Sequence, residues 1–115
     1  MYAVIFEVIP TAAGKDEYLE IAARLRAYLE GREGFISIER FQSLVDEGKI
    51  LSLSFWETEA SIAAWRQLFE HRAAQKAGKD RLFKSYRIRV AEVVRDYTAV
   101  ERGEAPADSN VELVL

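Results

Sequence analysis

The stretch FISIERFQSLVDEGKILSLSFW, residues 35–56, carries the pattern that decides the fold. Its two ends, residues 35–44 and 50–56, are rich in aromatic and branched aliphatic side chains, as in strands. Asp46, Glu47 and Gly48 between them are typical of a tight turn. The stretch therefore predicts a β-hairpin.

Both strands of this hairpin present large apolar side chains on both faces, because successive side chains of a strand point to opposite sides. In residues 50–56, the alternation sets Leu51, Leu53 and Phe55 against Ile50 and Trp56. In residues 35–44, the alternation places Ile36, Ile38 and Leu44 on one face and Phe35 and Phe41 on the other.

The sequence on either side of the hairpin predicts two helices and two further strands. Residues 2–9 form an apolar run that ends at Pro10, and residues 16–29 carry apolar side chains at helical spacing before Gly31. Thr58 is typical of a helix N-cap, so we expect a second helix over about residues 59–77, interrupted near Glu70. A long last strand is expected over residues 86–97.

The order β-α-β-β-α-β predicts an α+β domain of the ferredoxin-like type, an antiparallel sheet with both helices on one face. The other face also carries apolar side chains, so something must cover it. A homodimer through the sheet faces is one solution, since two-fold self-association is the commonest oligomer. The alternative is a mixed face over which the chain's own tail folds.

The chain divides into a domain over residues 1–98 and a tail over residues 99–115. The tail begins as a polar linker containing Pro106 and Gly103 and ends in the strand-like segment 111–115.

Composition excludes several classes of function. The net charge of −3 and the absence of basic runs argue against nucleic-acid binding, and with no cysteine there is neither a disulfide nor a thiolate ligand. A single histidine among scattered acids gives no metal-ligand spacing. No signal peptide or membrane span is expected, so we predict a soluble, cytoplasmic protein.

Five segments carry a family resemblance: 34–41 (GFISIERF), 53–59 (LSFWETE), 64–65 (AW), 70–75 (EHRAAQ) and 86–93 (YRIRVAEV). Together they resemble the antibiotic biosynthesis monooxygenase (ABM) superfamily over about residues 1–97. The resemblance implies a dimeric α+β barrel, in which the sheets of two ferredoxin-like subunits face each other. It also implies oxygen chemistry, because members include cofactor-independent oxygenases of polycyclic aromatics, quinol oxygenases and haem-degrading monooxygenases.

The haem-degrading members carry a first-strand asparagine, a tryptophan on the second helix and a haem-ligating histidine further along that helix. Trp65 matches the tryptophan. Glu7 stands at the position of the asparagine and Gln75 at that of the histidine, and His71 lies before Gln75. Haem is therefore possible but not favoured, and no protein-bound cofactor is expected. Without one, an electron-rich substrate such as a phenol or quinol has to supply the electrons.

Two residues are candidate catalytic groups. His71 is the chain's only histidine and could serve as a general base, or it could be a partly exposed helix residue. Glu7, an acid in an apolar strand, could be a carboxyl of raised pKa facing a cavity, or half of an ion pair with Arg40, Arg87 or Arg89.

Aromatic side chains are the candidate substrate-binding residues: Phe6, Phe55, Trp65, Phe69 and Tyr86. They could line an apolar pocket between the helices and the sheet, although Trp65 also fits a core position on its helix.

Three functions follow, and the sequence leaves them open. The first is a small ABM-type monooxygenase that acts on an aromatic or quinol-like compound without a protein-bound cofactor. The second is a non-catalytic dimeric module for a small apolar ligand. The third is a haem-binding or haem-degrading monooxygenase.

Overall fold

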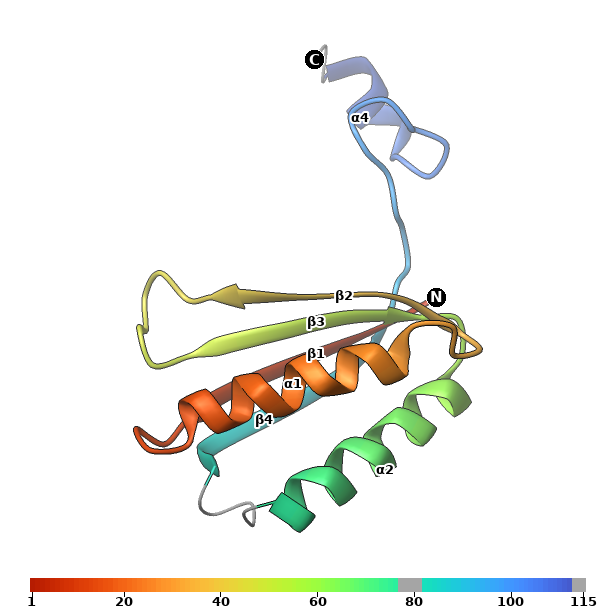
Figure 1. Cartoon of the computed structure of the whole chain (residues 1–115). Helices are drawn as coiled ribbons and strands as arrows, with labels where there is room; N and C mark the ends of the chain where they lie inside the picture. The colour runs from red at the N-terminus through yellow and green to blue at the C-terminus, as the bar shows by residue number, and fades with distance from the viewer. Residues whose placement is uncertain (77–81, 113–115) are drawn as a thin grey trace.

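Four strands form one antiparallel sheet in the order β2-β3-β1-β4, and two long helices cover one of its faces (Figure 1). The computed structural model describes residues 1–76 and 82–112, with side chains for residues 1–68 and 82–110. The elements follow the chain in this order: β1 (Tyr2–Pro10), α1 (Lys15–Leu29), β2 (Phe35–Gln42), β3 (Ile50–Trp56), α2 (Glu59–Lys76), β4 (Phe83–Glu92) and α4 (Ala107–Glu112). The predicted ferredoxin-like order is confirmed.

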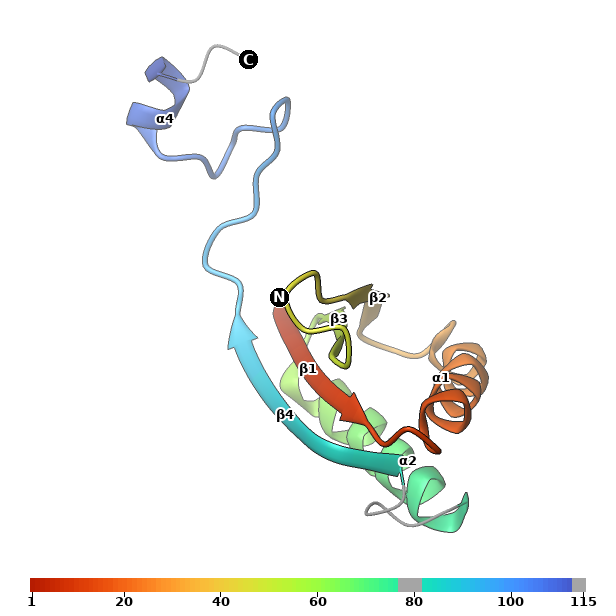
Figure 2. The same cartoon turned by 90° about the vertical axis from the view of Figure 1, so that its left-hand side faces the viewer.

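The central strand β1 gives the sheet its two faces. Val4, Phe6 and Val8 are buried toward the helices, and the ring of Phe6 lies 6.5 Å from the ring of Tyr18 of α1. Figure 2 shows α1 on the β2 side of the sheet and α2 on the β4 side. We call this side the helix face and the other side the open face.

A bulge in β2 changes the predicted alternation of that strand. The register passes from Phe35 opposite Trp56 to Ser37 opposite Phe55, so one extra residue, Ile36, is inserted. Phe35 therefore joins Ile38 on the helix face. The prediction that these two side chains lie on opposite faces was wrong, because alternation reverses across a bulge.

The start of α2 and the end of α1 lie at the predicted signals. Thr58 caps α2, since its Oγ1 accepts a hydrogen bond from the Ser61 N–H at 3.2 Å. Gly31, which follows α1, has a φ of +80°. The expected interruption near Glu70 is absent, and α2 is a single helix from Glu59 to Lys76.

The open face carries apolar side chains from the two central strands. Ile5 of β1 lies opposite Leu53 of β3, and Leu51 and Phe55 continue the row on either side. No helix covers this side of the sheet in the part of the chain that the structure describes (Figure 1).

The end of the chain differs from the prediction. β4 ends at Glu92 rather than continuing to Tyr97, and α4 occupies residues 107–112. The expected strand-like character of Val111 and Glu112 was therefore wrong, and residues 113–115 lie outside the described part. We define the C-terminal arm as residues 93–112. No described helix is long and apolar enough to cross a membrane.

Candidate functional site

The helix face of β4 exposes a strip of apolar side chains beside α2. Tyr86, Ile88 and Val90 lie opposite Val8, Phe6 and Val4 in register, so their side chains point to the same side as the helices. Their exposed fractions are 47%, 39% and 48%, although they border the buried core. We call these three residues the β4 strip and treat it as the candidate binding surface.

Aromatic rings form the floor of the β4 strip. The Tyr86 ring lies 5.9 Å from the ring of Phe6 and 5.8 Å from that of Phe83, both in edge-to-face geometry. Phe6 itself is buried at 3% exposure. An edge-to-face cluster with one half-exposed member can receive a flat apolar molecule, because aromatic rings attract one another in this arrangement.

Trp65 lies in the core beneath α2. Its ring centroid is 6.0 Å from that of Trp56, which is completely buried and donates its Nε1–H to Ser54 Oγ at 2.8 Å. Trp65 is 6% exposed, so most of its surface serves packing. Its role in binding a substrate stays a prediction.

Glu7 and Phe55 lie on the open face, away from Phe6, Trp65 and Tyr86. The Glu7 carboxylate is 3.6 Å from Arg89 Nη1, which matches the ion-pair alternative for this residue. Both side chains are partly exposed, so this pair contributes little stability. The structure therefore separates the predicted site residues into two groups on opposite sides of the sheet.

Phe69, His71 and Gln75 belong to α2, but their side chains lie outside the described residues. The backbone places His71 on the helix that borders β4 (Figure 2). Its catalytic role stays a prediction.

The first strand does not supply the asparagine that haem-degrading members of the family carry there. On the helix face, β1 presents Val4, Phe6 and Val8, and the carboxylate of Glu7 points to the other side. Glu7 and Trp65 of one subunit therefore cannot line one haem site together. In the described residues, no group of three or more His, Asp or Glu side chains could hold a metal ion.

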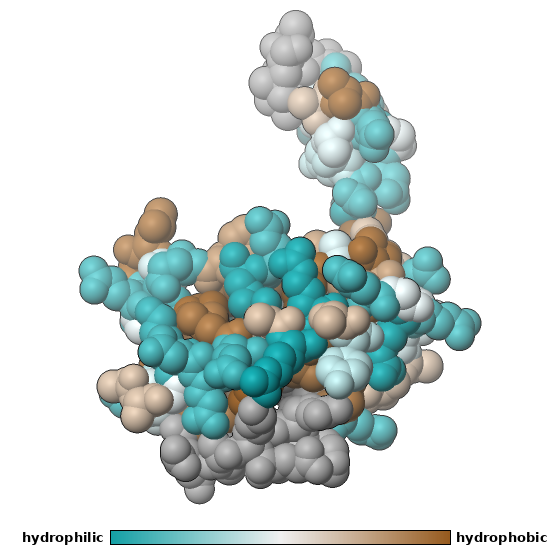
Figure 3. Space-filling model, in the orientation of Figure 1, coloured by the Kyte–Doolittle hydropathy of each residue, from teal (hydrophilic) through white to brown (hydrophobic). Residues whose placement is uncertain are grey.

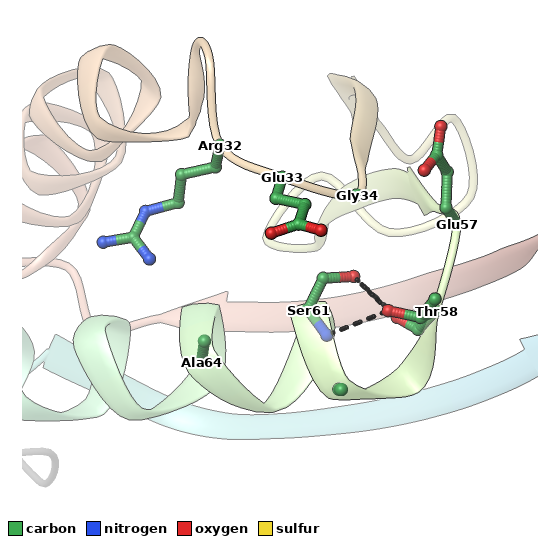
Figure 4. A pocket seen from close by; sticks show the side chains of 8 residues that line it. Arg32, Glu33, Gly34, Glu57, Thr58, Ser61 and Ala64 are labelled. Carbon is green, nitrogen blue, oxygen red and sulfur yellow. Dashed lines mark hydrogen bonds between the residues drawn. The ribbon is translucent and has the colours of Figure 1, made fainter.

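A hollow of about 380 Å³ lies at the start of α2 (Figure 4). Arg32, Glu33 and Glu57 stand at its rim, and the hydrogen-bonded pair of Thr58 and Ser61 forms one side. Two carboxylates oppose the attraction that a helix N-terminus has for anions, so we assign no ligand to this hollow.

A second polar feature lies under α1. Arg40 of β2 points to the helix face, where it hydrogen-bonds the buried hydroxyl of Tyr18. Burial raises the pKa of Tyr18, and the positive charge and hydrogen bond of Arg40 oppose this shift. Sequence reasoning assigned Arg40 only as a partner for Glu7. Its position two residues after Ile38 was the signal that it faces the core.

The fold and the β4 strip define a class, a ferredoxin-like α+β domain with an apolar surface between one helix and the sheet edge. The chain belongs to the antibiotic biosynthesis monooxygenase family, whose model matches residues 1–77. The predicted family is thereby confirmed.

Two curated relatives show how far the similarity extends. "Jasmonate monooxygenase ABM" of Pyricularia oryzae is 45% identical over 93 residues, which are 81% of this chain and 43% of that protein. YqjZ of Bacillus subtilis, an uncharacterized protein, is 32% identical over 82% of this chain and 80% of its own length. The chain thus spans less than half of the first relative and most of the second.

Among solved structures, SnoaB of Streptomyces nogalater, a cofactor-independent oxygenase in its N63A mutant form, superposes with a TM-score of 0.66. The match covers 83% of this chain and 94% of that chain at 11% identity. At this identity the similarity establishes the shared fold.

Proposed function

We propose that this protein is a monooxygenase that oxidises a small aromatic or quinol-like compound without a protein-bound cofactor. The observation that carries the proposal is the β4 strip, a half-exposed apolar surface with an aromatic floor beside α2. Membership of the monooxygenase family supports the reaction type. An apolar surface of this kind suits a flat hydrophobic substrate, because binding removes apolar area from water.

The oxidation of such a substrate by dioxygen balances without an added reductant. An anthrone-type methylene reacts with dioxygen to give a carbonyl and water: R₂CH₂ + O₂ → R₂C=O + H₂O. One oxygen atom enters the substrate, and the other leaves as water with the two methylene hydrogens. The substrate itself loses the four electrons that reduce dioxygen.

The protein's part in this reaction is to bind the substrate and to remove a proton, which makes the substrate a better electron donor. We assign this base to His71, because it belongs to the helix beside the β4 strip. Glu7 is the alternative base, on the open face. An imidazole titrates close to neutral pH, which suits a general base.

Oxygen uptake with a panel of anthrones and quinols tests this proposal. We expect turnover that His71→Ala lowers by about 10²-fold or more and Glu7→Gln leaves nearly unchanged. The reverse pattern would move the base to Glu7. A ligand that raises the melting temperature without any oxygen uptake would instead identify a non-catalytic binding module.

A second substrate class is favoured by the relative that is 45% identical and is named a jasmonate monooxygenase. Jasmonates are small, largely aliphatic carboxylic acids without an electron-rich ring. Inserting one oxygen atom into such a C–H bond therefore takes two electrons from a reductant. Turnover of jasmonate only in the presence of an added reductant would select this class over the quinol class.

Haem is the least supported ligand, because the middle of β1 presents the apolar side chains of Val4, Phe6 and Val8 to the helix face. We propose that haem is not the cofactor. A haemin titration tests this directly, and a Soret shift that His71→Ala removes would contradict it.

We also propose that the protein works as a homodimer joined through the open faces of two sheets. The row formed by Ile5, Leu51, Leu53 and Phe55 supports this, since no described helix covers it. Covering such a row with its own copy removes apolar surface from water in both subunits at once.

A further inference from the structure

The C-terminal arm, residues 93–112, stands away from the rest of the molecule. Figures 1 and 2 show it leaving the sheet beside the N-terminus and rising on the side opposite the helices. The radius of gyration is 16.8 Å, compared with about 13 Å for a compact chain of this length. The arm therefore extends away from the compact body of its own chain.

The arm has an ordered internal structure. Thr98 and Glu101 close a turn, in which the Thr98 N–H donates to the Glu101 carbonyl at 2.9 Å and the Glu101 N–H donates to Thr98 Oγ1 at 2.8 Å. Arg102 then holds α4 in place, because its Nε donates to Asn110 Oδ1 at 2.9 Å and its Nη2 donates to Ser109 Oγ at 2.6 Å. These contacts hold residues 98–110 of the arm in one shape.

The arm nevertheless leaves apolar side chains in water. Val94 is 76% exposed and Val100 is 87% exposed, and Figure 3 shows hydrophobic atoms on the arm well away from the body. Among the described residues, the last backbone hydrogen bond from the arm to the body is that of the Val93 N–H to the Met1 carbonyl. An ordered segment with exposed apolar side chains and little contact with its own body is typical of an interaction surface.

We propose that the arm of each subunit lies against the body of a second copy of this chain. The second copy is the occupant because the arm rises on the open-face side, where the partner sits in the homodimer proposed above; the inference rests on that dimer. Two-fold symmetry makes the exchange mutual, so each arm packs against the body of the other subunit. Val94 and Val100 then become buried between subunits.

Isotope-resolved cross-linking tests the exchange in the full-length protein. The chain has no cysteine, so Val100→Cys gives a single site for a benzophenone label. The benzophenone-labelled protein is prepared once at natural isotope content and once with ¹⁵N. The two preparations are mixed, refolded together and irradiated, and the masses of the cross-linked peptides are measured. An arm on the partner gives about half of the cross-links between a light and a heavy peptide, as random pairing of equal amounts requires.

Two further single-cysteine variants make every result informative. Ser37→Cys lies on the open face and reports the sheet dimer, and Ala23→Cys, on the exposed side of α1, is the negative control. Position 37 could give cross-links between light and heavy peptides while position 100 gives only like-isotope cross-links or none. This result would overturn the arm exchange and would still support the dimer. Mixed cross-links from neither position would overturn both.

Charge placed on the arm gives an independent test. We expect Val94→Asp combined with Val100→Asp to raise the dimer dissociation constant at least about tenfold, since each valine would be buried between subunits. Ala23→Asp is the matched control and should leave it unchanged. Equal dissociation constants for the arm variant and the unmodified protein would show that the arm touches no partner.

Discussion

At the scale of single residues, Gly31 and Gly34 adopt the left-handed backbone region in which a side chain is strained. Their φ angles are +80° and +83°. The space around them differs, because a Cβ at Gly31 meets nothing within 4 Å, whereas one at Gly34 would lie 2.6 Å from Ser61 Oγ. The two positions therefore separate backbone strain from steric conflict.

Alanine substitution at both glycines measures that separation. We expect Gly31→Ala to lower the free energy of unfolding by about 1 kcal/mol through backbone strain alone. Gly34→Ala should cost about 1–3 kcal/mol more, because Ser61 and the start of α2 have to move. Urea denaturation of both variants checks this, and equal losses would show that Ser61 moves freely.

A second residue-scale prediction concerns alkaline stability. Burial raises the pKa of Tyr18 above its ordinary value of 10.0, so the folded state holds the phenol proton more tightly than the unfolded state does. The stability from this group is fully present below the pKa of the unfolded tyrosine. It is lost as the pH rises through the pKa of the folded state.

Urea denaturation between about pH 8 and pH 11 tests this linkage. Tyr18→Phe should lose less stability over this range than the unmodified protein. The matched control is Tyr28→Phe, an exposed tyrosine on the same helix, which should keep the full pH dependence. Parallel curves for the Tyr18 variant and the unmodified protein would contradict the assignment to Tyr18.

At the scale of elements, helix boundaries follow local signals, whereas strand faces depend on pairing. Thr58 and Gly31 mark the boundaries of α2 and α1 where the sequence predicts them. The β2 bulge, in contrast, comes from the register with β3 and reverses the predicted side of Phe35. Residues 107–112 form α4 although the tail was expected to be a linker with a strand-like end.

The N-cap of α2 gives the element-scale prediction. Thr58 Oγ1 accepts from the Ser61 N–H at 3.2 Å, and Ser61 Oγ donates to the Thr58 carbonyl at 2.7 Å. Thr58→Ala should therefore destabilise the protein by about 1 kcal/mol, whereas Thr58→Ser keeps the hydroxyl and should cost a few tenths of that. Thermal or urea unfolding measures both, and equal effects would assign the loss to the methyl group.

At the scale of the whole molecule, the sheet separates two apolar surfaces. The β4 strip lies beside α2, and the row that includes Leu53 lies on the opposite face. The proposed substrate surface and the proposed dimer contact therefore do not compete for the same side of the sheet. The C-terminal arm rises on the side of the open face (Figure 1).

Sedimentation equilibrium tests the role of the open face. Leu53→Asp should shift the protein from dimer to monomer, because it places a charge in the middle of the proposed contact. Leu19→Asp, a matched change of an exposed leucine on α1, should leave the dimer intact. A dimer that survives Leu53→Asp would place the contact elsewhere.

The sequence by itself determined the order of the elements, the helix signals and the family. Each of these depends on neighbouring residues, as in the alternation of residues 50–56 or the cap at Thr58. The aromatic content that favours an apolar substrate was likewise visible in the chain. Local sequence could predict them because local backbone preference and side-chain periodicity decide them.

Only the tertiary structure decided which candidate residues can act together. Phe6 and Glu7 are neighbours in sequence, yet they point to opposite sides of the sheet, so Glu7 meets Arg89 and Phe6 meets Tyr86. The direction of the C-terminal arm was equally beyond the sequence. Strand register and the path of the chain in space result from contacts between distant segments, and a single stretch of sequence does not contain them.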